Sequence, residues 1–323
     1  MNPNQTLFFS HTEFLLLGFP GISKARPLVV IPFLSIYVVI LTGNSLVIHQ
    51  IRIEKSLQSP MYYLISLLFA VNITSTSVVL PKFLLGLAFN LNEVTLHGCL
   101  AQMFCIYFLA IFESSVVLLM ALDRYVAICR PLHYHHIMTK PFLLRLGLIG
   151  LLRGGVLVSP LVILASRVRF CGSNVILNFA CENMALLSLA CGDVSKSQVA
   201  GMAVRVLVTV IDVAFLLVSY SGILYTAMNI AAGKARHKAL HTCSTHLSVA
   251  VSIYLSALLA SVVYRMETVS YDVQNLFSAV YLMVPATLNP FIYGLRVKEI
   301  RECLARSWRK RNASPAHKRV NRT

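Results

Sequence analysis

An acid and a base lie side by side at the end of a long apolar run. Asp123 and Arg124 follow the mostly apolar residues 99–122, and a basic loop rich in histidine begins after Cys129. Charge close to the hydrocarbon of a bilayer is costly, so such side chains are usually paired and functional. The pair could act as a switch whose contacts are exchanged for those of a partner. The plainer alternative is an ordinary anchor at the membrane interface.

Other reactive residue types do not form a catalytic or metal-binding set. Glycine-rich phosphate loops are absent, so we expect no enzyme activity and no cofactor. The histidines of the expected inner loops and helix ends are better explained by solvated basic segments than by a metal site. These histidines are His133, His135, His136, His237, His241 and His246.

The composition indicates an integral membrane protein. The chain has 323 residues, of which 57% are apolar and only 12% are charged, whereas a soluble protein carries about a quarter charged residues. Its net charge of +16 could suggest a nucleic-acid partner. That interpretation fails because the charges cluster between apolar blocks, as in the cytoplasmic loops of membrane proteins.

Seven apolar blocks are long enough to cross a bilayer, which takes about 20 residues per helix. They cover residues 28–49, 61–89, 99–128, 142–165, 199–230, 246–264 and 273–295. Such blocks without strand alternation predict helices, and hence an all-α seven-transmembrane bundle. Basic residues interleaved with apolar ones over 296–311 predict a short amphipathic eighth helix on the inner leaflet.

The basic residues also predict orientation, because lysine and arginine favour cytoplasmic loops. We expect a multi-pass plasma-membrane protein with an extracellular segment 1–26, a seven-transmembrane domain 27–296, and an amphipathic helix with a cytoplasmic tail over 297–323. Residues 1–26 lack the pattern of a cleavable signal, so the first span should direct insertion. Asn4 begins an Asn-Gln-Thr glycosylation sequon in the outer segment.

The eight cysteines divide into two groups under this topology. Cys99, Cys171, Cys181 and Cys191 face the oxidising side and can form two bridges, for which three pairings are open. Cys105, Cys129, Cys243 and Cys303 are expected to be free thiols. Cys303 could be palmitoylated or simply buried.

Six short motifs in order resemble the olfactory (odorant) receptors of the rhodopsin-like G-protein-coupled receptor superfamily. They are Gly43-Asn44, Ser59-Pro60-Met61-Tyr62, residues 120–134, Ser219-Tyr220, residues 238–246, and residues 285–293. The likeness covers nearly the whole chain. Residues 17–22, Arg153-Gly154 and Asp212 resemble the class I, or fish-like, branch.

The resemblance implies a role for each end of the bundle. It pairs Cys99 with Cys181 and Cys171 with Cys191, which would make the long outer loop a lid. It places a G protein against Arg124 in the active state, with Asp123 holding Arg124 otherwise. The other residues that it assigns to this switch are Tyr125, Tyr220, Asn289, Pro290 and Tyr293.

Two parts of the implied switch should move. Pro290 removes a helix hydrogen bond, and Asn289 is expected to bond the freed backbone and form a hinge; a static kink is the alternative. The inner end of the sixth span, residues 238–246, should swing outward, unless it is merely a solvated basic face.

A ligand should bind between the outer halves of spans three, five and six, under the lid. Arg265 could hold a carboxylate bidentately, with Ser261 one turn deeper on the same helix face. Arg265 could instead be hydrated or paired with Glu267. Tyr107 and Met184 are further lining candidates. Some acid-binding relatives have histidine in place of Tyr107, and because tyrosine is not a cation it weakens recognition of a small acid. The apolar Met184 favours larger or less polar odorants.

A polar core should connect this pocket to Arg124. The family usually has aspartate where this chain has Asn72, so Glu113 is left without the usual second acid. Glu113 should be protonated or paired with Asn72, Ser114 or Ser115, and sodium dependence should be weak. Asn44 completes the core.

The sequence therefore predicts an odorant receptor for a small volatile or water-soluble organic molecule, which activates a stimulatory olfactory G protein and raises cAMP. Its partners would be the odorant, the heterotrimeric G protein and the lipid bilayer, with no nucleic acid. One alternative is a seven-helix receptor for an endogenous metabolite, such as a carboxylic acid, expressed outside the nose. A transporter would need inverted repeats and broken helices, which the sequence lacks.

Overall fold

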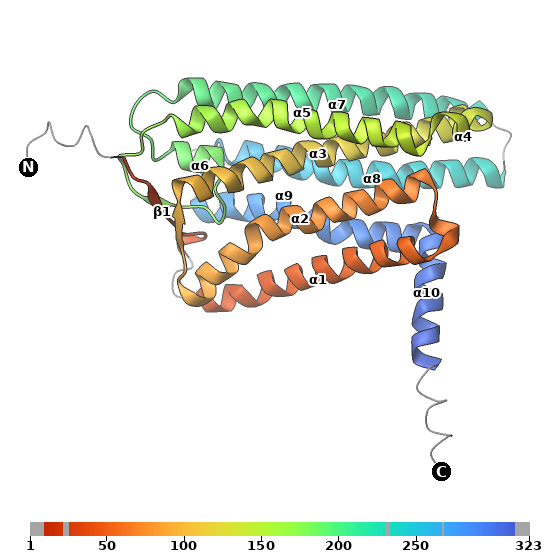
Figure 1. Cartoon of the computed structure of the whole chain (residues 1–323), viewed down its shortest axis with the longest axis horizontal. Helices are drawn as coiled ribbons and strands as arrows, with labels where there is room; N and C mark the ends of the chain where they lie inside the picture. Colours follow the sequence, from red (N-terminus) through yellow and green to blue (C-terminus); the bar gives the residue numbers. More distant parts are fainter. Residues whose placement is uncertain (1–9, 22–25, 230–232, 267, 314–323) are drawn as a thin grey trace, which may run out of the picture.

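Seven long helices lie side by side in an elongated bundle, in a computed structural model that describes residues 10–21, 26–229, 233–266 and 268–313 (Figure 1). The helices are α1 (Arg26–Ile53), α2 (Pro60–Phe89), α3 (Leu96–Cys129), α5 (Lys140–Ser166), α7 (Ser195–Asn229), α8 (Lys234–Val263) and α9 (Tyr271–Arg296). All seven are long and apolar enough to cross a membrane. The predicted seven-helix fold is confirmed.

Local sequence signals explain where several helices begin. Pro60 occupies the first turn of α2, where its missing N–H costs nothing. The side chains of Thr95 and Thr139 cap α3 and α5 by accepting from the backbone N–H groups of Gly98 and Phe142. The sixth long helix, α8, begins at Lys234, so it includes the expected inner segment 238–246 as well as the apolar block 246–264. Its first turns are polar, and an apolar run marks only the part of a helix that lies in hydrocarbon.

The two ends of the bundle carry different small elements (Figure 1). At the sheet end, β1 (Glu13–Leu16) pairs antiparallel with β2 (Glu93–Thr95) and parallel with β3 (Val175–Ile176). The short helix α6 (Asn183–Leu187) lies at the same end. At the opposite end, called here the α10 end, lie η2 (Lys55–Leu57), η3 (Pro131–His133), α4 (Tyr134–Ile137) and α10 (Lys298–Ala313).

The sheet covers one end of the bundle and was not predicted. β1 inserts Phe14 edge-on against Phe170, with the ring centroids 5.5 Å apart. The disulfide Cys99–Cys181 lies in the same buried cluster, and Cys171–Cys191 closes the neighbouring loop. These are the two pairs that the resemblance implied. The lid is thus tied to α3 by a covalent bond and to the N-terminal segment by a sheet.

At the other end, α10 leaves the bundle at a steep angle to the long helices (Figure 1). Its apolar side packs inward, with Ile300 fully buried, as expected for an amphipathic helix. The Cys303 side chain is only 2% exposed and its sulfur accepts from Arg306 at 3.2 Å. This burial favours the interpretation of Cys303 as a buried thiol. Asn4 and its sequon lie outside the described residues.

Candidate functional site

The acid–base pair at the α10 end has a third member. The guanidinium of Arg124 bonds Oδ2 of the buried Asp123 through Nη2 and through Nε, the latter at 2.9 Å. The hydroxyl of Tyr134, the first residue of α4, donates to Oδ1 of Asp123 at 2.7 Å. Burial and the negative Asp123 raise the pKa of Tyr134, so its hydroxyl keeps its proton. Both carboxylate oxygens are therefore occupied, and the loop after α3 is part of the switch.

A second contact at this end joins α8 to α9. The hydroxyl of Tyr293 and Nδ1 of His246 are 3.1 Å apart, and both side chains are buried. The prediction that His246 is a solvated loop residue was wrong, because the inner extension of α8 places it on a helix face that packs inside the bundle. This contact joins α8 to α9.

Tyr125 and Tyr220, the other two tyrosines assigned to the switch, take part in packing. The ring of Tyr125 lies against Gly222 of α7, where an added Cβ would come within 2.7 Å of the ring. Tyr220 is half-buried against the apolar cluster at this end of the bundle. The close approach of α3 and α7 therefore depends on a glycine.

A side chain of α1 bonds the backbone carbonyl group that Pro290 leaves without a donor in α9. Because Pro290 has no N–H, the carbonyl of Ala286 loses its helical donor, and Asn44 Nδ2 of α1 donates to it at 3.0 Å. The expectation that Asn289 would fill this role was wrong. Asn289 is fully buried, and neither polar atom of its side chain has a partner within the described part of the chain. Asn72 Nδ2 donates to Asn44 Oδ1 at 3.2 Å, so Asn44 links α1, α2 and α9.

A small cavity lies beside this network. Its volume is about 30 Å³, and its polar lining comprises Asn72, Ser75, Glu113 and Tyr281. One water needs about 10–15 Å³ measured in this way, so the cavity has room for a water molecule or two. The carboxyl of Glu113 can therefore be solvated inside the bundle.

The two serines proposed as partners of Glu113 accept hydrogen bonds from Arg153 instead. Arg153 Nη1 of α5 donates to Ser114 and Ser115 at 3.4 and 3.3 Å. Arg153 Nη2 is 2.6 Å from Oδ1 of Asp212 in α7, and the hydroxyl of Tyr254 in α8 donates to Oδ2 at 3.0 Å. This network joins four helices at mid-bundle.

Sequence reasoning took Arg153 and Asp212 only as marks of a family branch and missed their contact. A signal was present, because an arginine and an aspartate inside separate apolar blocks must each find a partner in a bilayer. The spacing of the blocks alone could not show that they meet each other, since this depends on which helices are neighbours.

At the sheet end, the lid is held close to α3. The backbone N–H of Cys181 donates to Gln102 Oε1 at 2.9 Å, and that of Asn183 donates to the Tyr107 hydroxyl at 3.1 Å. Met184 follows in α6 and is half-buried. The Tyr107 hydroxyl therefore accepts a hydrogen bond from the lid, in addition to any contact with a ligand.

Ser261 and Arg265 come together as predicted from their spacing, with Arg265 Nη1 donating to the Ser261 carbonyl oxygen at 3.0 Å. The alternative partner Glu267 lies outside the described residues. An unpredicted residue joins them, because Arg205 of α7 donates to the Ser261 hydroxyl. The ligand candidates thus lie on α3, the lid and α8, with Arg205 added from α7.

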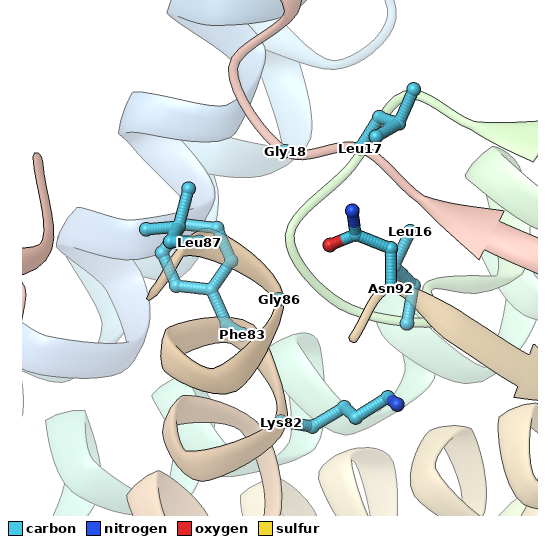
Figure 2. A pocket seen from close by; sticks show the side chains of 8 residues that line it. All are labelled: Leu16, Leu17, Gly18, Lys82, Phe83, Gly86, Leu87 and Asn92. Carbon is cyan, nitrogen blue, oxygen red and sulfur yellow. The ribbon is translucent and has the colours of Figure 1, made fainter. Parts of the chain in front are cut away.

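Figure 2 shows another small pocket, between β1 and the sheet end of α2. Lys82 and Asn92 line it together with apolar residues, and its volume is about 10 Å³. Ligand pockets measure about 300–1,000 Å³, so this hollow fits no more than a water molecule.

Seven membrane-crossing helices, a disulfide-anchored lid at one end and a buried acid–base pair at the other define a seven-helix receptor. The family model of olfactory receptors matches residues 33–311. Olfactory receptor 52K1 of Homo sapiens is 36% identical over 93% of this chain and 96% of its own length. Olfactory receptor 51E2 of Mus musculus is 37% identical over 91% of this chain and 92% of its own length.

The chain belongs to the olfactory receptor family, and its function is that of an odorant receptor. It is a multi-pass membrane protein of a family that consists of G-protein-coupled receptors rather than enzymes. The predicted family is confirmed.

Replacing Asp212 with Asn should strongly destabilise the receptor, because Arg153 is left as a largely buried charge without its carboxylate. Breaking a buried pair from one side costs about 3–5 kcal/mol. Thermal unfolding of the detergent-purified receptor measures the effect, and the double variant Arg153→Gln/Asp212→Asn should recover part of the loss. An unchanged unfolding temperature in the single variant would contradict this role.

Proposed function

We propose that the sheet end faces the outside of the cell and binds the odorant, and that the α10 end faces the cytoplasm and binds the G protein. The orientation is supported by the basic residues of α10 and of the loop around Arg130, and by the two disulfides at the opposite end. Segment 1–26 would then be extracellular, 27–296 the membrane domain, and 297–323 cytoplasmic.

The odorant binds under the lid, beside Tyr107, Met184, Ser261 and Arg265. The observation that carries this proposal is the meeting of Ser261 and Arg265 at the end of α8, close to Tyr107 and the disulfide-bound segment of the lid. A guanidinium and a hydroxyl at this place can bind a carboxylate or another oxygen acceptor. The preferred ligand is therefore a small organic acid.

Binding at α8 reaches the cytoplasmic end through contacts that α8 already makes. Tyr254 connects α8 to Asp212, and His246 connects it to Tyr293. A ligand can shift the equilibrium between the two positions of α8 only by the difference between its binding free energies for them. Loss of the His246–Tyr293 contact lets α8 move outward and opens the surface around Arg124.

Arg124 then leaves Asp123 and contacts the G protein. Asp123 keeps the Tyr134 hydroxyl as a donor in this step, so its charge is not left without a hydrogen bond. The G protein is the olfactory stimulatory type, and its nucleotide exchange raises cAMP.

The ligand site is tested by a cAMP reporter screen of acids, alcohols, aldehydes and ketones in transfected cells. Arg265→Ala should raise the half-maximal concentration of an active acid by about tenfold or more, since it loses a charge-assisted hydrogen bond. Lys196→Ala, which removes an exposed cation at the same end of the bundle, is the control. If the Arg265→Ala variant responded to every active ligand as the unmodified receptor does, Arg265 would not be a ligand-binding residue.

The switch is tested by replacing Arg124 with Ala. Without the guanidinium the G protein loses its contact, so ligand-dependent cAMP should disappear while surface expression, measured by antibody labelling of intact cells, persists. Continued signalling would refute the role of Arg124.

A further inference from the structure

Arg205 is a cation within the membrane-crossing helix α7 (Ser195–Asn229), and no predicted site includes it. Its side chain points from α7 towards α8, where it donates to the hydroxyl of Ser261. Ser261 is only 8% exposed, so the guanidinium reaches an inward-facing hydroxyl rather than the lipid headgroups. An ionisable group at such a position is costly and usually functional.

Two arginines from different segments therefore meet at one serine. Arg205 bonds the hydroxyl of Ser261, and Arg265 bonds its carbonyl oxygen at 3.0 Å. A guanidinium has five N–H donors, so these bonds leave donors free on both side chains. Both arginines are exposed. The planar fork of each guanidinium matches a carboxylate.

An acid of the lid, Glu182, interacts with Arg205. Glu182 follows Cys181 in the lid and accepts a hydrogen bond from Ser278. Burial raises the pKa of Glu182, although Arg205 and Ser278 oppose the shift. No ion pair joins Arg205 to a carboxylate among the residues that the structure describes. Two positive charges thus face each other across Ser261 and repel.

We propose that Arg205 and Arg265 form a two-cation site for a small dianion, a short dicarboxylate. One carboxylate binds each guanidinium, and the Ser261 hydroxyl, now donating, bonds the ligand between them. Binding relieves the repulsion between the two arginines, so a second negative charge on the ligand adds affinity that a monoacid cannot obtain. This inference rests on the proposed ligand site and specifies its chemistry.

The test compares glutarate with pentanoate, a monoacid of the same chain length, by thermal unfolding of the full-length receptor in nanodiscs at increasing ligand concentration. In the unmodified receptor glutarate should bind at least about tenfold more tightly than pentanoate. Arg205→Gln should remove this advantage and leave pentanoate binding nearly unchanged. Arg205→Lys should keep part of the advantage because it keeps the charge.

The matched control is Arg167→Gln, which removes an exposed arginine at the sheet end of α5 and should leave the glutarate advantage intact. The unfolding temperature without ligand shows whether each variant is folded. If the Arg205→Gln variant does not fold, the affinities of glutarate and pentanoate for the unmodified receptor and for Arg205→Lys test the proposal instead.

Equal binding of the two acids overturns the proposal, as does an Arg205→Gln variant that weakens both acids equally, in which case both arginines hold one carboxylate. A receptor that signals to neutral odorants but binds no acid keeps its odorant function and also overturns the two-cation site. Binding of glutarate without a cAMP response would instead contradict the proposed signalling and leave the site standing.

Discussion

Asp123 and Asp212 carry charge inside a bundle whose surroundings solvate charge poorly, and each must therefore be held by a cation and a tyrosine. Arg124 and Tyr134 hold the first, and Arg153 and Tyr254 hold the second. Removing one partner from such a site is costly, whereas exchanging it for another can be nearly neutral.

The helix α8 connects the two ends of the molecule. It carries Ser261 near the lid, Tyr254 at the Asp212 network and His246 at the contact with α9. The lid itself is rigid, because a disulfide, a sheet and hydrogen bonds to α3 fix it.

The sequence predicted the seven helices well, because apolar blocks report directly on burial in hydrocarbon. It could not predict contacts that depend on helix neighbours. Asn44 rather than Asn289 bonds the backbone freed by Pro290, since the donor comes from another helix. Arg205 was not predicted as a site residue, because its contact with Ser261 depends on how α7 and α8 are placed. The sheet was missed because β1 is four residues long and gains its order from its neighbours.

The contact between His246 and Tyr293 should hold the cytoplasmic end of α8 against α9. Spin labels at the exposed positions Arg130 and His237, in a receptor without its four free cysteines, report the distance between the cytoplasmic ends of α3 and α8. Pulsed electron-spin resonance on Tyr293→Phe without ligand should show a longer distance than in the parent receptor, since His246 loses its hydrogen bond to the Tyr293 hydroxyl. An identical distance distribution in the two receptors would contradict the claim.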